Sequence, residues 1–276
     1  MVVDFIGLGA QKSGTSWVYA CLYEHPEVCA PVKELHFFSR ERFSNGKDWY
    51  ESHFRRCAPE KRSGEFSTSY LYSPEAPARI KEYYPNAKLI AILRNPITRA
   101  YSQYRNAIKA GEVSKGTSFE TYREQEPSCI EQGRYVEQLE RYYRYFSKEQ
   151  ILVCLYEDID ADKLAFIQSI YRFLDVDATF VPTMLYTRVN TARTPRVVWV
   201  DRLMHRTAEF LRRIGLDALV FFVKKSGVTD TIRNINTGAG PKEGPSASQD
   251  LKGYFRDDVI RLSALIGRDL SKEWNI

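Results

Sequence analysis

The segment from Phe5 to Tyr19, FIGLGAQKSGTSWVY, carries the residue types of an anion-binding loop. An apolar run leads into a glycine-rich turn that contains Lys12, and the turn leads into a pattern typical of a helix. Gly9 and Gly14 have the spacing of the two glycines of a P-loop, where backbone N–H groups and a helix N-terminus bind phosphate. The segment therefore predicts a site for a phosphate-like group between a strand and a helix.

This loop differs from the ATP-binding form of the motif in the position of its lysine. In the ATP-binding form a lysine and a serine or threonine follow the second glycine. Here Thr15 and Ser16 follow Gly14, and Lys12 lies inside the loop. A γ-phosphoryl group is highly charged and is held with Mg²⁺, whereas a less charged sulfuryl group can be held without a metal by a lysine near its bridging oxygen. The expected ligands of the transferred group and its phosphate are Gln11, Lys12, Ser13, Gly14, Thr15 and Ser16.

A second segment also has a strand that leads into a helix. Lys88–Leu93 is an apolar run typical of a buried strand, and RNPITRAYSQY follows it directly. Asn95 suits the N-cap of a helix and Pro96 its first position, which leaves Arg94 at the carboxyl end of the strand, where open α/β sheets bind ligands. Ser102 falls about two turns into the helix. We expect Arg94 and Ser102 to bind a second anionic group, with an ion pair as the alternative role of Arg94.

Between these segments lies PVKELHFFS, from Pro31 to Ser39, which carries a carboxylate and an imidazole. If the segment is extended, Glu34 and His36 share a face. Transfer of a group to a hydroxyl needs a base for the hydroxyl proton, and a carboxylate or imidazole within hydrogen-bond distance serves this purpose. Glu34 is the candidate base. His36 either shares the catalytic role and orients the acceptor, or is a wall residue beside two phenylalanines.

Taken together, the two anion-binding segments resemble the sulfotransferases that use 3′-phosphoadenosine 5′-phosphosulfate (PAPS). FIGLGAQKSGTS resembles the 5′-phosphosulfate loop of that family, and RNPITRAYSQY resembles its 3′-phosphate site. PVKELHFFS resembles a stretch of the heparan-type (carbohydrate) and related bacterial sulfotransferases in which the glutamate is the catalytic base. The resemblance implies PAPS as the donor, no metal, Lys12 at the bridging oxygen and Glu34 as the base. RVNTARTPR resembles a stretch near the nucleotide, which adds Arg193, or Arg196 in its place, to the expected cofactor site, with a solvated loop as the alternative.

The segment GEFSTSYLYSP, from Gly64 to Pro74, departs from the family pattern. Where heparan-type relatives supply a second active-site lysine, this chain has Phe66. Lys12 is then the only clearly placed lysine, unless Lys33 or an arginine from a loop substitutes. Glu65 and Ser67 remain candidate polar groups on the acceptor side, with a solvated or paired charge as the alternative role of Glu65. The resemblance implies a hydroxyl acceptor and favours a carbohydrate over a lipid, a carrier-bound acyl chain or a small natural product. The apolar Phe66 argues against a glycosaminoglycan.

The expected elements place these residues on an α/β fold. Apolar strands at Asp4–Leu8, Lys88–Leu93 and Ile151–Tyr156 alternate with helical patterns, which predicts a P-loop-like, mostly parallel sheet flanked by helices on both faces. The length suits one sulfotransferase-type domain over residues 1–276. Stretches rich in Gly, Ser and Pro predict mobile loops at 109–118 and 236–250.

Composition and charge narrow the class of protein. A net charge of +5 suits an anionic nucleotide, and scattered basic residues without a helix-turn-helix or zinc pattern argue against nucleic acid. The five cysteines form no CxxC, which suits reduced thiols. No signal peptide or run of about 20 apolar residues is visible. We expect a cytoplasmic enzyme, unless this is the trimmed catalytic domain of an anchored protein. An interrupted amphipathic run at 203–225 predicts packing, with peripheral membrane contact as the alternative.

Two other functions compete with sulfuryl transfer. A P-loop kinase of a small metabolite would need ATP, Mg²⁺ and an acidic metal-binding residue, which the sequence pattern does not supply. A nucleotide-binding protein without catalysis is favoured by one feature, the phenylalanine at position 66. The acceptor and the oligomeric state stay open from the sequence.

Overall fold

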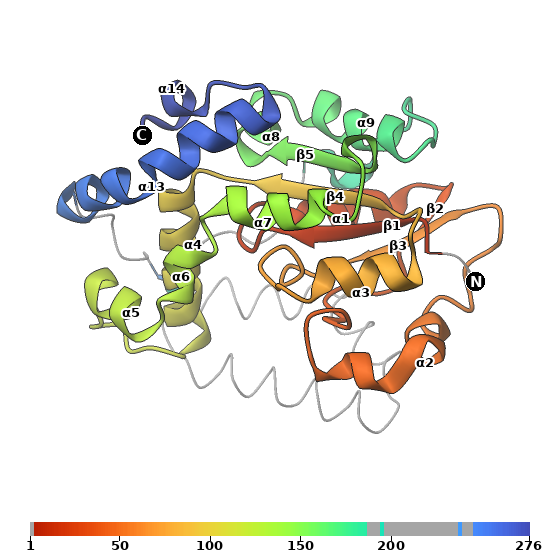
Figure 1. Ribbon diagram of the computed structural model, residues 1–276, viewed down its shortest axis with the longest axis horizontal. Coiled ribbons are helices and arrows are strands. Elements are labelled where there is room, and N and C mark those ends of the chain that lie inside the picture. The colour runs from red at the N-terminus through yellow and green to blue at the C-terminus, as the bar shows by residue number, and fades with distance from the viewer. Residues whose placement is uncertain (1–2, 187–193, 196–236, 239–244) are drawn as a thin grey trace. The chain divides into compact units, whose positions relative to one another are not determined.

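The computed structural model describes residues 3–186, 194–195, 237–238 and 245–276 (Figure 1). The chain divides into two compact units, which are described separately. The first comprises Met1–Arg99, Ile130–Asn190 and Ser248–Ile276, and the second Ala100–Cys129 and Thr191–Ala247. The single domain expected over 1–276 stays a prediction.

A parallel sheet forms the centre of the first unit (Figure 1). Its strands pair in the order β2-β3-β1-β4-β5, and every pairing is parallel. The three strands expected from the sequence are confirmed within one residue at each end. The strands are β1 (Phe5–Gly9), β2 (Val28–Cys29), β3 (Arg62–Phe66), β4 (Lys88–Leu93) and β5 (Ile151–Leu155).

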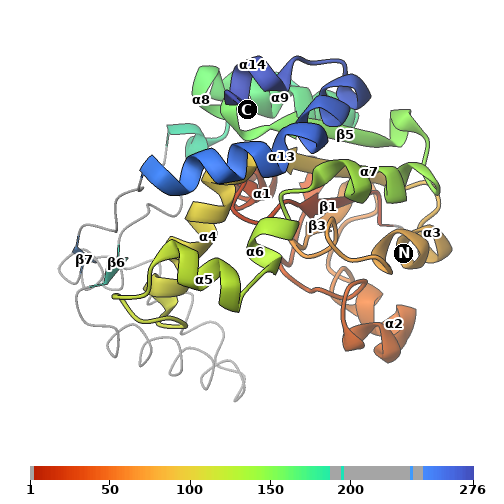
Figure 2. The same cartoon turned by 60° about the vertical axis from the view of Figure 1, so that its left-hand side comes forward.

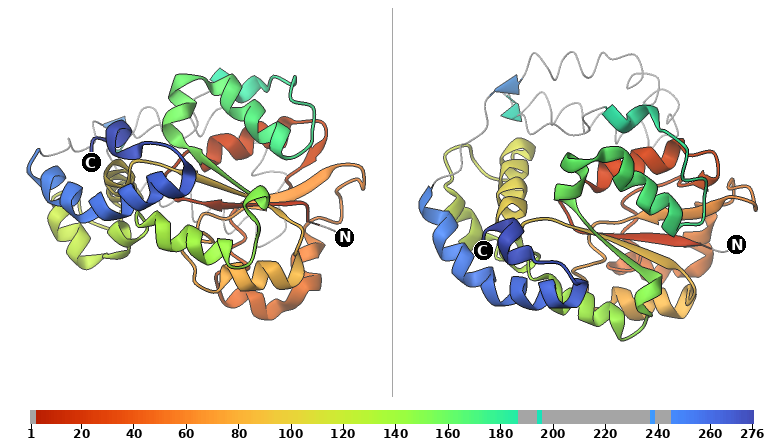
Figure 3. Two further views of the ribbon diagram at one scale, coloured as in Figure 1. Left: turned by 45° about the horizontal axis from the view of Figure 1, so that its top comes forward. Right: turned by 90° about the horizontal axis from the view of Figure 1, so that it is seen from above.

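Helices cover both faces of this sheet, as the alternating pattern predicts. Figure 3 shows α1 and α9 on one face and α3 and α7 on the other. The helices of the described residues are α1 (Thr15–Glu24), α2 (Gly46–Ser52), α3 (Ala76–Tyr83), α4 (Pro96–Ala110), α5 (Phe119–Gln125), α6 (Ser128–Glu131), α7 (Tyr135–Tyr143), α8 (Tyr156–Ala161), α9 (Lys163–Phe173), α13 (Pro245–Ile266) and α14 (Leu270–Trp274).

A buried apolar cluster joins one face of the sheet to α1 and α9. The strands contribute Phe5, Phe66, Ile90 and Ile92, and the helices contribute side chains such as Val18, Leu22, Ile167 and Ile170. Burial of side chains of this size stabilises the fold by about 1.5–3 kcal/mol each. This packing fixes the positions of the strand ends, from which the loops of the site start.

The second unit contains the end of α4, α5 and the short antiparallel pair β6 (Thr194–Pro195) and β7 (Thr237–Gly238) (Figure 2). Tyr101 of α4 stacks on Phe119 of α5 with ring centroids 4.0 Å apart. The predicted mobility of 109–118 stays a prediction. Residues 236 and 239–244 of the other predicted loop, Arg193 and the run at 203–225 lie outside the described residues. In the part of the chain that the structure describes, no helix is long and apolar enough to cross a membrane.

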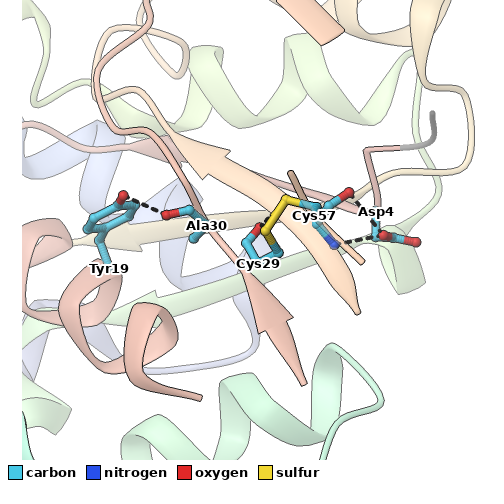
Figure 4. The surroundings of a disulfide bond; sticks show 6 residues. Asp4, Tyr19, Cys29, Ala30 and Cys57 are labelled. Carbon is cyan, nitrogen blue, oxygen red and sulfur yellow. Dashed lines mark hydrogen bonds between the residues drawn. A yellow bond between two sulfur atoms is a disulfide. The ribbon is translucent and has the colours of Figure 1, made fainter. Parts of the chain in front are cut away.

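A disulfide joins Cys29, at the end of β2, to Cys57 in the chain before β3 (Figure 4). Next to it, the Tyr19 hydroxyl donates a hydrogen bond of 2.7 Å to the carbonyl of Ala30. The expectation of reduced thiols is therefore wrong for this pair, because cysteines that are distant in sequence meet here without a CxxC spacing. The free cysteines, all buried, are Cys21, Cys129 and Cys154.

Candidate active site

The candidate residues of the first unit gather at the carboxyl edge of the sheet. β1 is the middle strand, with β3 on one side and β4 on the other. Because the strands are parallel, the loops after β1, β3 and β4 start at the same edge, which is where open α/β sheets bind ligands. The segment after β2 reaches this edge as well, since Lys33 pairs with Phe66 at the end of β3.

The loop after β1 has the geometry of an anion cradle. Gly14 has a φ of 82°, and a Cβ added there would lie 3.0 Å from the Tyr156 ring, so only glycine fits without strain. Helix α1 starts at the next residue, and since glycine has no side chain, its first N–H groups have no side-chain cap. Ser13 Oγ is buried and has no hydrogen-bond partner among the described residues. These groups fit a bound phosphate or sulfuryl oxygen.

Arg94 connects this loop to the next strand. Its Nη1 donates a hydrogen bond of 3.1 Å to the carbonyl of Lys12, and its guanidinium lies 4.4 Å from the centre of the Tyr156 ring. The Tyr135 hydroxyl in turn donates to the carbonyl of Arg94 at 2.9 Å. These contacts hold the arginine beside the loop and do not form the ion pair considered as its alternative role.

The helix start after Arg94 is as predicted. Asn95 Oδ1 accepts hydrogen bonds from the N–H groups of Ile97 at 3.0 Å and Thr98 at 3.2 Å, and α4 begins at Pro96. Ser102 lies in the part of α4 that belongs to the second unit. Its pairing with Arg94 on one anion therefore stays a prediction.

Glu34 and His36 lie side by side, although the segment is not extended as expected. Their φ values are 61° and 53°, which are left-handed conformations that residues other than glycine seldom adopt. His36 Nε2 lies 3.1 Å from Glu34 Oε2, and Thr68 donates to the same oxygen from its N–H at 3.1 Å and its hydroxyl at 3.0 Å. The other ring nitrogen, His36 Nδ1, lies 2.7 Å from Ser69 Oγ. The predicted pair is therefore in contact, with polar partners from the loop after β3.

The surroundings of this pair favour a charged carboxylate beside a neutral imidazole. Burial raises the pKa of Glu34, but the charge and hydrogen bond of Lys33 and the N–H of Thr68 outweigh it, so this pKa lies below its usual value. Burial lowers the pKa of His36, and the opposing charge of Glu34 does not restore it. At neutral pH the carboxylate can therefore accept a proton, while the imidazole contacts it as a hydrogen-bonding partner.

A buried carboxyl below the pair holds the left-handed backbone. Glu65 is fully buried and accepts hydrogen bonds from the hydroxyls of Tyr70 at 2.6 Å and Ser67 at 2.8 Å. These hydroxyls in turn accept from the backbone N–H groups of Phe37 at 3.0 Å and His36 at 2.9 Å. Glu65 is thus part of the support for the base segment and not a polar group facing the acceptor, because no part of its side chain reaches the surface.

The buried position of Glu65 predicts a loss of stability as the pH rises. Burial raises the pKa of Glu65 from 4.5 to about 7. Between these values the folded protein keeps a proton that the unfolded chain has lost, so the contribution of Glu65 to the free energy of unfolding is largest below pH 4.5 and is lost as the pH rises through 7, by about 3 kcal/mol. Glu65→Gln should therefore show a smaller loss of unfolding free energy between pH 5 and pH 8 in urea titrations.

The exposed Glu82 of α3 provides the matched control. Glu82→Gln should keep the wild-type dependence on pH. If Glu65→Gln loses as much stability between the two pH values as the wild type does, Glu65 is not the group that causes the loss.

Three further residues of the site did not stand out in the sequence. Thr68 and Ser69 contact the base pair, and Tyr156 packs against Arg94. A signal existed for the first two, because a run of small hydroxyl residues directly follows a strand of the parallel sheet. Arg193 and Arg196, by contrast, lie outside the described residues. Within the described ranges, no group of three or more His, Cys, Asp or Glu side chains is placed to bind a metal ion.

The fold and the site together define a group-transfer enzyme with an anion-binding loop on a parallel sheet. Residues 3–215 match the family model described as the sulfotransferase domain, so the chain belongs to the sulfotransferase family. Membership of this family makes it an enzyme of the transferase class.

Curated relatives and a solved structure agree with this assignment. The human bifunctional heparan sulfate N-deacetylase/N-sulfotransferase 3 is 25% identical over 95% of this chain and 29% of its own length. The mouse heparan sulfate glucosamine 3-O-sulfotransferase 5 is 28% identical over 65% of this chain and 55% of its own. The crystal structure of a sulfotransferase from Alicyclobacillus acidocaldarius is 26% identical, covers 100% of both chains and has a TM-score of 0.73. The chain thus spans about three tenths of the bifunctional relative and about half of the other.

Proposed function

We propose that this protein transfers a sulfuryl group from PAPS to the hydroxyl of an acceptor. The observation that carries the proposal is the joining of base and cradle by one side chain. Lys33 Nζ donates to Glu34 Oε1 at 2.8 Å and to Ser16 Oγ, in the first turn of α1, at 3.3 Å. The candidate base for the acceptor and the candidate cradle for the donor are therefore close enough for one ammonium group to contact both.

PAPS supplies an activated sulfuryl group on a phosphate leaving group. In the proposed mechanism the loop from Gln11 to Ser16 binds the 5′-phosphosulfate, and Arg94 with Ser102 binds the 3′-phosphate. Glu34 accepts the proton of the acceptor hydroxyl, whose oxygen then forms the new bond to sulfur. Lys12 stabilises the negative charge that develops on the bridging oxygen as its bond to sulfur breaks. His36 positions Glu34, which it contacts.

The proposed acceptor is a carbohydrate hydroxyl. Support comes from the named heparan sulfate relatives, which match most of this chain at low identity. A lipid, a carrier-bound acyl chain and a small natural product are the alternatives that an acceptor screen would separate. Glu34 keeps 31% of its side chain exposed, which leaves room for an acceptor of any of these kinds to approach it.

Metal independence is also a proposal, and the cytoplasmic location expected from the sequence stays a prediction. The lysine in the loop supports the first, because it supplies a positive charge at the transferred group. The disulfide between Cys29 and Cys57 is the observation that argues against a reducing compartment, where such bonds are rare. Assay of the cytoplasmic and exported fractions of the source cells would separate the two locations.

The donor site is tested by calorimetric titration with 3′-phosphoadenosine 5′-phosphate in EDTA, beside ATP with and without Mg²⁺. We expect metal-free binding of the bisphosphate by the wild type. Arg94→Ala should weaken it by about 10- to 100-fold, because a charge-assisted hydrogen bond to phosphate is worth about 1.5–3 kcal/mol.

The exposed Arg256 of α13 provides the control, and Arg256→Ala should bind as the wild type does. Binding of Mg–ATP alone would overturn the proposal and favour the kinase. Metal-free binding that survives Arg94→Ala unchanged would remove Arg94 from the cofactor site.

A further inference from the structure

Lys33 is the side chain with contacts to both halves of the site. Its ammonium lies between the carboxylate of Glu34 and the hydroxyl of Ser16, at 2.8 Å and 3.3 Å. The Lys33 side chain is 21% exposed, so it borders the site and is not a freely solvated surface lysine. Two hydrogen bonds to groups of different function restrict its position before any substrate binds.

The strand next to Lys33 offers no second cation at this level. Phe66 is the residue that pairs with Lys33, and it is fully buried. Its ring fills the space above Gly7, where an added Cβ would lie 2.0 Å from the ring. A charged side chain at position 66 would have to displace this packing. Position 33, one strand further along and facing the site, carries the positive charge instead.

We propose that Lys33 is the second cation of the transfer site, which pairs with Glu34 before transfer and stabilises the transferring sulfuryl group once Glu34 has taken the acceptor's proton. This inference rests on the proposed sulfuryl transfer and adds a residue to it. In this step the acceptor oxygen gives its proton to Glu34 and forms a bond to sulfur. The bond from sulfur to the bridging oxygen breaks, and its electron pair stays on the departing phosphate.

Protonation of Glu34 gives the physical reason why the Lys33 ammonium shifts its interaction from Glu34 to the sulfuryl group. An ionised Glu34 attracts the ammonium strongly, whereas a protonated Glu34 no longer carries a charge for it. At the same moment the anionic sulfuryl group in the cradle is transferred, and negative charge develops on the bridging oxygen that it leaves. The Ser16 hydroxyl, already in contact with Lys33 Nζ, lies in the first turn of the helix that forms this cradle. The ammonium therefore has a partner on the donor side as its bond to the base weakens.

The groups that influence Glu34 come from two segments. Lys33 and His36 come from its own segment, and Thr68 donates to it from the loop after β3. Glu65, whose pKa Glu34 raises, lies below it on β3, and Arg40 and Arg42 act on His36. Removal of the Lys33 charge should thus raise the pKa of Glu34, since an adjacent opposite charge lowers a carboxyl pKa by about 1–3 units.

The test compares Lys33→Met and Lys33→Arg with wild type. The readout is the release of 3′-phosphoadenosine 5′-phosphate from PAPS with water as the acceptor, measured from pH 4 to pH 9. Lys33→Met should lower the rate on the order of 10²-fold, and the acidic limb of its pH profile should move to higher pH by about one unit. Lys33→Arg keeps the charge, so the acidic limb of its pH profile should match that of the wild type, and its rate should be at least about tenfold higher than that of Lys33→Met. The exposed Lys148 is the control, and Lys148→Met should match the wild type.

Each outcome is decisive for the inference. If Lys33→Met has a lower rate but the acidic limb of its pH profile does not move, Lys33 is a structural residue. If the limb moves but the rate is normal, Lys33 is only a partner of Glu34. Either result overturns the second-cation role. Failure of the proposed function is distinguishable, because then the wild type itself releases no product from PAPS. In that case the second-cation role falls with it, whereas bisphosphate binding in EDTA would still report the donor site.

Discussion

Replacement of Glu34 with glutamine is expected to lower the rate of product release from PAPS by about 10² to 10³. An amide cannot accept the proton of the attacking hydroxyl or water. Its oxygen can still accept the Thr68 N–H, which now bonds Glu34 Oε2 at 3.1 Å, so the loop after β3 should keep its position. The measurement is single-turnover release of 3′-phosphoadenosine 5′-phosphate, together with calorimetric binding of that product, which should be unchanged.

Two comparisons make this result specific. Glu82→Gln, on the exposed side of α3, should turn over as the wild type does. The pH profile of the wild type should stay flat through neutral pH and fall only in acid, because the pKa of Glu34 is held below its usual value. Near-wild-type turnover of Glu34→Gln would show that another group takes the proton, and His36, which contacts Glu34, would be the first candidate.

Replacement of Lys12 with alanine is the second large effect, also about 10² to 10³ in rate. The lysine side chain acts on charge that exists only as the bridging bond breaks, so kcat and kcat/KM should fall by the same factor. Lys12 has a φ of 71°, which alanine tolerates no better, and its contact with Arg94 runs through the backbone carbonyl at 3.1 Å. The substitution therefore leaves the loop's link to Arg94 in place.

Product binding separates this role from simple attraction of an anion. Lys12→Ala should bind 3′-phosphoadenosine 5′-phosphate nearly as well as the wild type, and Lys148→Ala should be normal in both rate and binding. If binding and rate fall by an equal factor, Lys12 holds the donor equally in the ground and transition states. Its role at the bridging oxygen would then be wrong.

The parts of the site that follow directly from a strand could be predicted from the sequence. The turn at Gly14 and the helix start at Asn95 and Pro96 depend on backbone preferences of a few neighbouring residues. These preferences can be read from one segment. A helix follows the first turn as expected, and the second helix begins at Pro96 as predicted. The parallel sheet was likewise predictable, because its buried strands are continuous apolar runs.

The base segment shows where this local reasoning ends. Glu34 and His36 were expected to share one face of an extended backbone, but the two residues meet through left-handed turns. Those turns are held by Ser67 and Tyr70, about thirty positions further along the chain. Such partners come together only when β3 pairs next to the segment. The meeting of Cys29 with Cys57 has the same long-range origin, and composition alone argued for the opposite.

That disulfide gives the chain a covalent ring, which begins at Cys29, ends at Cys57 and encloses Lys33, Glu34 and His36. The donor-binding loop and Arg94 lie outside the ring. Closure of a ring of this length stabilises a fold by about 3–4 kcal/mol. A protein prepared in strong reductant thus loses a constraint on its proton acceptor and keeps the chain geometry of its nucleotide site. A loss of transfer in strong reductant, with nucleotide binding retained, would therefore point to this ring and not to an absence of catalytic residues.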